Sequence, residues 1–266
     1  MAPYTGNGVW AAGSCFIEDA RAHDWQPREA VRSALRDRPG RERPSELSWR
    51  LACGSTYAEQ VGLDVAASLL HTCPEADMKW VLATAVADEA KHSAAFHEYA
   101  RSVADSVLEP SDAVDELSRD LMGMDDYTAR FIAHTLAEGF AADEFHWFVQ
   151  GLRRDGLGAV YRLVRRDENR HVALGMAYLT RGPGVARLRA MPADLFLESE
   201  RTVLRHNDTE SIGSLVHRLL PDVVGEDVAV WLRARHETRM RVLMNVRRDG
   251  EELSRRRQYE MHPTTQ

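Results

Sequence analysis

The chain has 266 residues, of which 44% are hydrophobic and 28% are charged, a composition that fits a globular protein with a sizeable core. Its net charge of −7 argues against a general affinity for nucleic acid, whose phosphates need a basic face. Only three cysteines occur, none in a Cys-x-x-Cys pair, so the sequence supports neither a disulfide framework nor a cysteine-ligated metal site.

Residues 1–44 contain glycine, proline and scattered charge, and they predict an irregular arm with one short helix near 27–35. Over 46–71 the apolar residues recur at helical spacing, and a proline ends the pattern. A second helical run extends over about 75–108 and is closed by Pro110.

Two more long helices are predicted over about 125–152 and 159–180, joined by a glycine-rich turn. Shorter helical patterns follow near 193–206, 208–220 and 225–247. Because no segment shows the period-two alternation of a strand, we predict an all-α fold.

The helical pattern divides the chain into four parts within one domain. A four-helix bundle over 45–181 follows the N-terminal arm over 1–44, and additional helices over 182–247 are expected to pack on that bundle. The highly charged residues 248–266 are expected to form a flexible tail.

The distribution of apolar residues argues against membrane insertion and secretion. No stretch of about 18 uninterrupted apolar residues occurs, and the first residues lack a basic segment before a long apolar run. The rarity of cysteine agrees with a reducing compartment. We therefore expect a cytoplasmic protein with no membrane partner.

The pattern D-E-x-[KR]-H occurs twice, as DEAKH over 88–92 in the second predicted helix and as DENRH over 167–171 in the fourth. Each string contains Glu-x-x-His, and residues three apart lie on the same face of a helix. The carboxylate and the imidazole of each string can therefore reach one point in the core of a bundle. Each string supplies half of a metal site.

A carboxylate-bridged di-metal centre needs one further carboxylate from each of the other two helices, because two divalent ions require about four negative charges in a dry core. Glu59 and Glu138 lie in the middle of those helices, each 30 residues before the glutamate of the string that follows. The equal spacing places both carboxylates at a similar height in the bundle. The predicted metal ligands are Glu59, Glu89, His92, Glu138, Glu168 and His171.

Three neighbouring residues have two interpretations each. Asp88 and Asp167 can accept a hydrogen bond across the bundle from the second ring nitrogen of a ligating histidine, or can be exposed and pair locally with Lys91 and Arg170. His134, one turn before Glu138, is either an extra ligand or donor close to the metals, or a packed, hydrogen-bonded core histidine.

At these residues, over about 45–180, the sequence resembles the ferritin-like di-metal carboxylate superfamily. Within it, the segments RLVRRDENRHVALG and EGFAA look most like the ligand-binding oxidases related to the ribonucleotide reductase small subunit. The resemblance implies a ferritin-like four-helix bundle with additional C-terminal helices. It also implies that the six predicted ligands bind two iron ions, or one manganese and one iron, and that the centre activates dioxygen.

The sequence departs from each subfamily at one position. Phe96 stands where the reductase subunits carry a radical tyrosine, and Ala133 stands where the oxidases carry the tyrosine that crosslinks to a valine, here matched by Val61. Ala142 replaces a threonine of the multicomponent monooxygenases, and Val164 replaces an added histidine of the arylamine N-oxygenases. We therefore expect neither a stored tyrosyl radical nor the crosslink.

The function predicted from these residues is a non-haem di-iron, or manganese–iron, oxidase or oxygenase that uses dioxygen to oxidise a small organic substrate by hydroxylation, desaturation or N-oxygenation. The candidate residues of the substrate pocket are Phe96, Ala142, Phe145 and Tyr161, although such aromatic residues are more often part of a core. An electron donor, either a reductase or a ferredoxin, and a second copy of the chain in a homodimer are the expected partners.

Two functions of other classes remain open at this point. A ferroxidase or iron-handling ferritin-like protein would use a similar centre, but storage ferritins are shorter and assemble into a cage. A metal-free helical interaction protein would explain the bundle but would leave four buried glutamates without a counter-charge, each at a cost of several kcal/mol.

Overall fold

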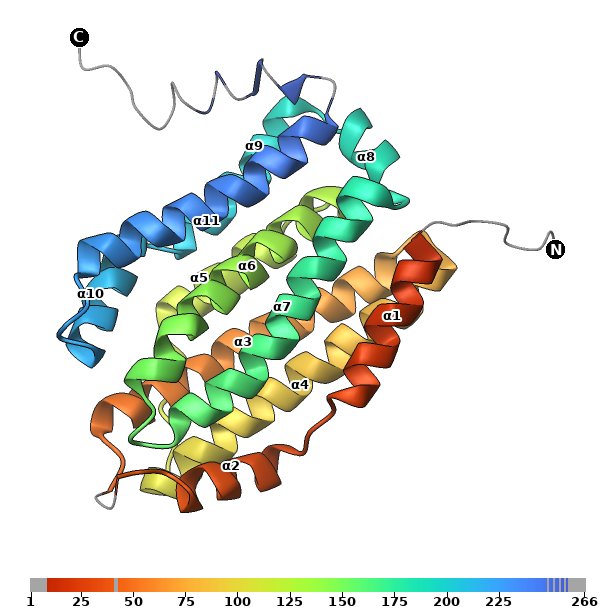
Figure 1. The fold of residues 1–266 in the computed structure, drawn as a ribbon. Coiled ribbons are helices and arrows are strands. Elements are labelled where there is room, and N and C mark those ends of the chain that lie inside the picture. The colour runs from red at the N-terminus through yellow and green to blue at the C-terminus, as the bar shows by residue number, and fades with distance from the viewer. Residues whose placement is uncertain are drawn as a thin grey trace, which may run out of the picture.

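The computed structural model describes residues 9–40 and 43–247, together with 249, 250, 252, 253, 255 and 257. These residues form eleven α-helices, and none of them belongs to a β-strand (Figure 1). The prediction of an all-α fold is confirmed.

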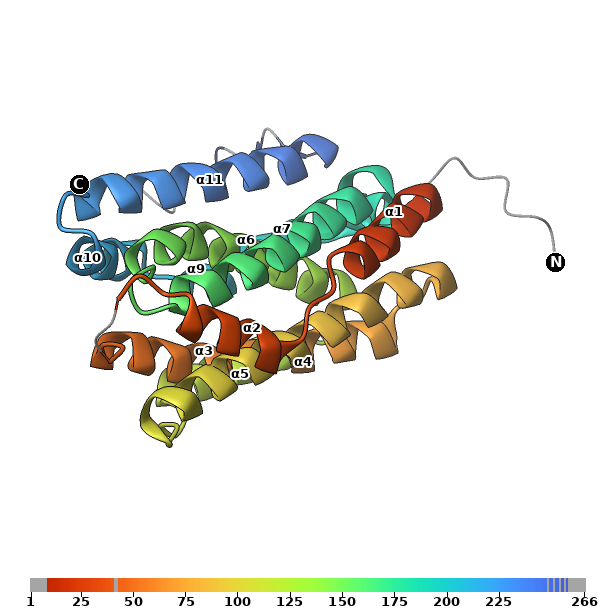
Figure 2. The same ribbon diagram turned by 60° about the horizontal axis from the view of Figure 1, so that its bottom comes forward.

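Four long helices lie side by side and form the central bundle (Figures 1 and 2). They are α3 (Glu46–Thr72), α4 (Ala76–Ala104), α6 (Tyr127–Gly151) and α7 (Leu157–Arg181). The most extensive packing is between α3 and α4 and between α6 and α7, so the bundle consists of two helical hairpins. All four helices were predicted, with boundaries close to those observed.

Local side-chain and backbone chemistry explains where these helices begin and end. The Ser45 side chain accepts a hydrogen bond from the backbone N–H of Ser48 at 3.2 Å and so caps α3. The α4 helix ends at Ala104 and not near residue 108, because Asp105 adopts a left-handed conformation with a φ of 53°. The apolar residues beyond it had extended the predicted helix too far.

The turn between α6 and α7 requires a glycine. Gly156 has a φ of 85°, and a Cβ atom at this position would lie 2.5 Å from the backbone oxygen of Ala34. The turn therefore approaches the N-terminal part of the chain closely, and α2 (Pro27–Arg36) packs against both α4 and α7.

The N-terminal arm is more regular than predicted. In addition to α2, residues 9–22 form α1 (Val9–Ala22), which packs along α4 and α7 (Figure 2). The prediction of irregular structure is wrong for this segment. Its sequence has a weak apolar period, and Phe16 and Ile17 gain their packing from the core of the bundle and not from their own helix.

Two short helices were also missed. The α5 helix (Asp112–Met122) packs against α3, α6 and α9, and α8 (Gly184–Ala190) follows the glycine–proline pair after α7. The α8 helix has only seven residues, about two turns, whereas the sequence predicted no helix in the acidic α5 segment between Pro110 and the next long helix.

The C-terminal helices were predicted within one or two residues. They are α9 (Ala193–His206), α10 (Thr209–Leu219) and α11 (Gly225–Val246), and all three pack against α6 (Figure 1). The assignment of these helices and the bundle to a single domain stays a prediction.

The tail beyond residue 247 is in part packed, contrary to prediction. Leu253 is 1% exposed, and the Arg257 guanidinium is paired with Glu200 and Glu237. A wholly flexible tail is therefore wrong for these two residues, which are anchored by tertiary contacts. Residues 248, 251, 254, 256 and 258–266 lie outside the part of the chain that the structure describes.

Two apolar clusters fill the bundle on either side of a polar layer. On α4, Met78, Val81 and Leu82 belong to one cluster, and Phe96 and Tyr99 belong to the other. The first acidic string lies on α4 between them. The polar layer is therefore enclosed along the bundle axis by apolar side chains, which keeps water away from it.

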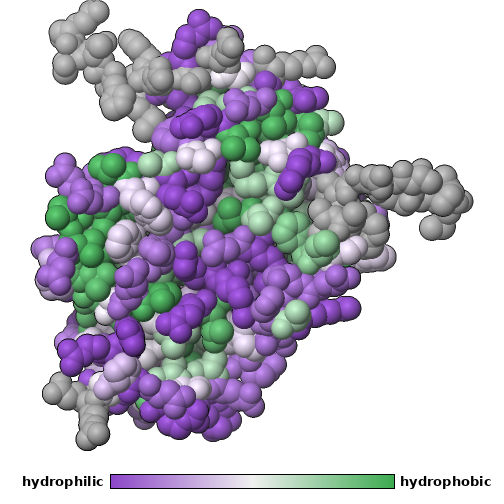
Figure 3. Space-filling model, in the orientation of Figure 1, coloured by the Kyte–Doolittle hydropathy of each residue, from purple (hydrophilic) through white to green (hydrophobic). Residues whose placement is uncertain are grey.

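The surface shown in Figure 3 is mostly hydrophilic, with the largest group of hydrophobic side chains over α10 and the start of α11. Val224 and Val230 in this region are 56% and 52% exposed. Among the helices of the described residues, none combines the length and the apolar character needed to cross a bilayer.

Candidate metal centre

All six predicted ligands converge in the polar layer, and each residue is buried, at most 7% exposed. The four bundle helices each contribute at least one of them, as the sequence spacing predicted. The residues are Glu59 of α3, Glu89 and His92 of α4, Glu138 of α6, and Glu168 and His171 of α7.

The cluster consists of two overlapping groups. Glu59 and His92 belong to one group and Glu138 and His171 to the other, while Glu89 and Glu168 belong to both. Within each group the potential ligand atoms all lie within 4.8 Å of one another. Two carboxylates that serve both groups are what a carboxylate-bridged pair of metal ions needs.

The imidazoles point the same nitrogen into the cluster. His92 Nδ1 lies 3.0 Å from Glu168 Oε1 and 3.3 Å from Glu59 Oε2. His171 Nδ1 lies 3.1 Å from Glu89 Oε1 and 3.3 Å from Glu138 Oε2. Each histidine therefore faces carboxylates of both hairpins.

The outer ring nitrogens meet the two aspartates across the bundle. His92 Nε2 lies 3.3 Å from Asp167 Oδ2 on α7, and His171 Nε2 lies 3.3 Å from Asp88 Oδ2 on α4. An aspartate that accepts the Nε2–H proton leaves Nδ1 as the free lone pair of the ring. The crossed arrangement therefore directs both lone pairs into the cluster.

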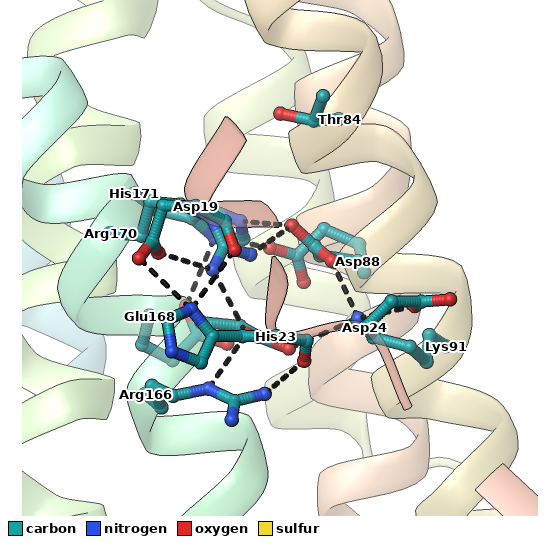
Figure 4. Close-up of polar contacts among 12 residues, drawn as sticks. Asp19, His23, Asp24, Thr84, Asp88, Lys91, Arg166, Glu168, Arg170 and His171 are labelled. Atoms are coloured by element: carbon teal, nitrogen blue, oxygen red, sulfur yellow. Dashed lines mark hydrogen bonds and ion pairs between the residues drawn. The ribbon is translucent and has the colours of Figure 1, made fainter. Parts of the chain in front are cut away.

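The same aspartates also form the ion pairs of the second interpretation, but its premise that they are exposed is wrong, because Asp88 and Asp167 are buried. Lys91 Nζ lies 2.7 Å from Asp88 and 3.2 Å from Asp167, while Arg170 lies 2.5 Å from Asp88 and 3.1 Å from Asp167. Figure 4 shows Asp88 between Lys91 of its own helix and Arg170 of α7. Burial alone would raise the pKa of Asp88, but hydrogen bonds from His171 and Lys91 hold it at about 2. These outer carboxylates are thus neutralised by the protein itself.

Among the described residues, no lysine or arginine pairs with the inner glutamates. Burial raises the pKa of Glu59 to about 8, and burial with the neighbouring charges of Glu138 and Glu89 raises the pKa of Glu168 well above its usual range. Glu89 Oε1 and both carboxylate oxygens of Glu168 are buried and accept no hydrogen bond from any described residue. Burial alone would also raise the pKa of Glu89 and Glu138, but the neighbouring histidines lower it. Four buried carboxylates that meet imidazoles but no fixed cation among the described residues fit two divalent cations.

The types of ligand atom in the cluster limit which metal ions can bind there. Carboxylate oxygen and imidazole nitrogen suit iron and manganese, whereas the absence of thiolate among the six residues disfavours soft ions. Since Glu59 and Glu168 hold protons readily when no cation is present, metal binding would displace protons from this cluster.

Trp25, which the sequence did not single out, contacts the site from the loop between α1 and α2. Its Nε1–H donates to Asp167 Oδ2 at 2.8 Å, and its ring stacks on His92 with centroids 6.2 Å apart. Lys91 Nζ lies 5.0 Å from the centre of the same ring. No local pattern in the predicted arm could have indicated this role.

Gly62 is a second residue that the sequence analysis missed. A Cβ atom at this position on α3 would lie 2.7 Å from Glu89 Oε2. The glycine therefore leaves the space that the Glu89 carboxylate occupies. Its position one turn after Glu59 is the signal by which it could have been found.

A cavity of about 350 Å³ opens beside the cluster, between α3 and α6 and under α5. Glu59, Glu89, Glu138 and Glu168 lie at its metal-facing end. Much of the remaining wall is apolar and includes Leu51, Val65, Leu117, Leu121, Phe145 and Phe148. The volume lies within the range of about 300–1,000 Å³ that is typical of small-molecule sites.

Only one of the four candidate pocket residues lies on this wall. Phe145 lines the cavity, whereas Phe96, Ala142 and Tyr161 do not and are instead buried in the core. Tyr161 packs against Phe96 and Phe145, with ring centroids 4.8 Å apart in each pair. The aromatic rings are therefore packed among themselves behind the cavity wall.

His134 faces the cluster without joining either group. Its Nδ1 lies 3.1 Å from Glu138 Oε1, and the side chain lines the cavity. In the described part of the chain, the groups of side chains close enough to hold one ion do not include it. The geometry favours a hydrogen bond to Glu138 over direct ligation.

Neither a protein-family model nor a curated protein matches the sequence. Among solved structures, the chain matches a tyrosine-to-phenylalanine mutant of an R2-like ligand-binding oxidase with an aerobically reconstituted Mn/Fe cofactor. The TM-score is 0.63 at 17% sequence identity, over 89% of this chain and 93% of the other. The protein therefore has the fold of that oxidase, and the prediction of a ferritin-like bundle with additional helices is confirmed.

Proposed function

We propose that the protein is a non-haem di-metal oxidase or oxygenase that uses dioxygen to oxidise a small organic substrate. One observation carries the proposal: the two ligand groups that share Glu89 and Glu168 open directly onto a largely apolar cavity. A site that joins a di-metal cluster to a small-molecule cavity is suited to oxidation of the molecule held there.

The six buried residues would hold two iron ions, or one manganese and one iron. The first group would bind one ion through Glu59 and His92, the second would bind the other through Glu138 and His171, and Glu89 and Glu168 are within reach of both. The Mn/Fe cofactor of the similar oxidase supports this choice of metals. When bound, the metal pair would supply the electrons and the activation of dioxygen that side chains cannot provide.

The surrounding residues prepare the site for this chemistry. Asp88 and Asp167 accept from the outer ring nitrogens of the histidines and keep the inner nitrogens available. Lys91 and Arg170 neutralise these aspartates, so the inner carboxylates alone set the charge that the cations meet. The apolar walls of the cavity and the covering helix α5 exclude water from the substrate.

Hydroxylation, desaturation and N-oxygenation all fit a cavity of this kind. In a hydroxylation the substrate does not provide all the electrons that reduce both oxygen atoms, so an external reductase or ferredoxin is part of the proposal. A homodimer in the cytoplasm is the form in which we expect the protein to act.

The test is to load the protein with Fe(II), or with Mn(II) and Fe(II), under anaerobic conditions and to measure metal per chain by elemental analysis. We expect about two ions per chain. Glu89→Gln and Glu168→Gln should each lose most of the metal, because each carboxylate serves both groups. Glu98→Gln, a partly exposed position on the same helix as Glu89, is the matched control and should keep it.

One ion or none in well-loaded protein would contradict the proposal. Oxygen uptake separates it from iron storage: a ferroxidase continues to consume oxygen as Fe(II) is added beyond the content of the centre, and forms ferric mineral. The proposed enzyme consumes oxygen with added Fe(II) only until the centre is oxidised, and thereafter only with a reductant and a substrate.

A further inference from the structure

We infer that Glu144 recognises the substrate in the cavity and that this substrate carries a protonated amine on an apolar body. The inference rests on the proposed function and deepens it by naming the substrate class. Glu144 lies on α6 between Glu138 and the end of the helix, and its partly buried side chain lines the cavity. No motif in the sequence marks this residue.

The basic side chains of the cavity wall already have anionic partners, and for His134 this partner is Glu138. Arg50 pairs with Glu46 at 2.7 Å, and His206 Nε2 lies 2.9 Å from Asp120 Oδ2. A substrate anion would therefore have to compete with a carboxylate for any of these basic groups. The wall offers no ready site for an acidic substrate.

The neutral polar groups of the wall are also engaged. The hydroxyl of Ser55 lies 2.7 Å from that of Tyr161, and the Asn207 amide donates to the backbone oxygen of Val203 at 2.8 Å. Among the residues described, by contrast, none makes a hydrogen bond or an ion pair with the Glu144 carboxylate. Apart from the glutamates of the metal centre, Glu144 is thus the polar side chain of the described wall that is left for a ligand.

An ionised carboxylate without a partner on the wall of a largely apolar cavity costs free energy unless a cationic ligand binds to it. Burial raises the pKa of Glu144 to about 7, and no nearby cation lowers it again. A substrate ammonium would restore the missing counter-charge through a charge-assisted hydrogen bond, while its apolar body packs against Phe145, Phe148 and the leucines of the wall. A carboxylate or phosphate group would meet repulsion at the same place.

The experiment compares three ligands of one shape and different charge: 4-phenylbutylamine, 4-phenylbutan-1-ol and 4-phenylbutanoate. Their binding to the metal-loaded protein is measured by calorimetry at about pH 8, where Glu144 is mostly ionised and an alkylamine is still protonated. We expect the amine to bind at least about tenfold more tightly than the alcohol, and the carboxylate to bind least.

The Glu144→Gln variant keeps the shape of the side chain and removes its charge. It should lose the preference for the amine, with affinity for the alcohol unchanged, while Glu98→Gln retains the wild-type order. In Glu144→Lys the preference should reverse toward 4-phenylbutanoate. Equal affinity of the wild type for the amine and the alcohol would overturn the inference, as would an amine affinity unchanged in Glu144→Gln.

Metal content is measured on the same samples, so that a failure of the di-metal proposal can be distinguished from a failure of the inference about Glu144. Two ions per chain without an amine preference would reject the role of Glu144 and leave the oxidase proposal standing. An amine preference in protein that binds fewer than two ions would reject the di-metal centre and leave Glu144 as the recognition residue of the cavity.

Discussion

The Glu89 and Glu168 carboxylates lie at the centre of the metal site. The charges of the metal-facing glutamates and those of the surrounding aspartates are balanced in different ways. Outside, Asp88 and Asp167 meet Lys91 and Arg170 within 3.2 Å. Inside, among the described residues, the four glutamates meet imidazoles and one another, and no lysine or arginine pairs with them. Because the outer charges cancel, the free energy of cation binding depends on the inner carboxylates and on the space left for them.

Gly62→Ala tests how tightly that space is defined. Its Cβ atom would lie 2.7 Å from Glu89 Oε2, so the carboxylate that both ligand groups share must shift. We expect metal affinity to fall by at least about tenfold, as for other changes that displace a ligand. The measurement is metal retained per chain during titration with a chelator.

Gly54→Ala on the same helix is the control. A Cβ atom at Gly54 would meet nothing within 4 Å, so the substitution should leave metal affinity unchanged and raise the free energy of unfolding by about 0.4–1 kcal/mol. Equal metal retention in both variants would show that the position of Glu89 does not depend on Gly62.

At the scale of the helix, each ligand is placed by the register of the helix that carries it. The Asp126 side chain accepts from the backbone N–H of Ala129 at 2.8 Å and caps α6, the helix that carries Glu138 and Glu144. The α5 helix that covers the cavity has Ser111 at the equivalent position, but no side-chain hydrogen bond there. The two helices therefore provide a matched pair of N-cap positions, of which only Asp126 makes a capping hydrogen bond.

Asp126→Ala should lower the free energy of unfolding by about 1 kcal/mol, because one backbone N–H at the start of α6 loses its acceptor. Ser111→Ala should change it by less than about 0.5 kcal/mol. Urea denaturation of both variants makes the comparison. A loss of similar size in the two variants would mean that the Asp126 hydrogen bond does not stabilise α6.

At the scale of the whole molecule, segments from both ends of the described chain close over the bundle. Trp25 and the helices around it cover the outer side of the metal centre, and α9 and α11 cover α6. Arg257 connects the end of the chain to this assembly: its Nε donates to Glu200 Oε2 at 2.7 Å, and Nη2 lies 2.9 Å from Glu237. His236 Nε2 lies 2.8 Å from the same Glu200.

Arg257→Ala should lower the free energy of unfolding by about 3–5 kcal/mol, because Glu200 would stay buried without its main cation. Arg241→Ala, at an exposed position on α11, should have an effect below about 0.5 kcal/mol. Chemical denaturation at neutral pH distinguishes the two variants. A small effect of Arg257→Ala would indicate that the end of the chain does not stabilise the fold.

The ion pair of Glu200 and Arg257 predicts that the stability of the fold depends on pH. Burial alone would raise the pKa of Glu200, but hydrogen bonds from His236 and Arg257 lower it below 4.5, its ordinary value. Ionised Glu200 therefore stabilises the fold above the unfolded-state pKa, and this contribution is lost as the pH falls through the lower folded-state pKa. The stability difference between wild type and Arg257→Ala should shrink as the pH falls below about 4.5. A difference that grows in acid would contradict this assignment.

The sequence by itself determined the parts of this protein that depend on local periodicity. Residues three apart share a helix face, so the two Glu-x-x-His strings could be recognised directly. The equal spacing of 30 residues then predicted that Glu59 and Glu138 would meet them. The structure brings together all six residues. Within each hairpin a short connection between two long helices leaves little freedom of register, and the packing of the two hairpins brings their ligands together.

Only the tertiary structure decided which other residues meet the site. Trp25 and Asp167 are 142 residues apart, and their contact depends on where α1 and α2 pack and not on any local pattern. The cavity likewise exists because α5 lies across α3 and α6, which places Phe145 and Glu144 on its wall and leaves Tyr161 behind it. Helical periodicity determines which face of a helix is buried, but which neighbour covers that face depends on the packing of the whole chain.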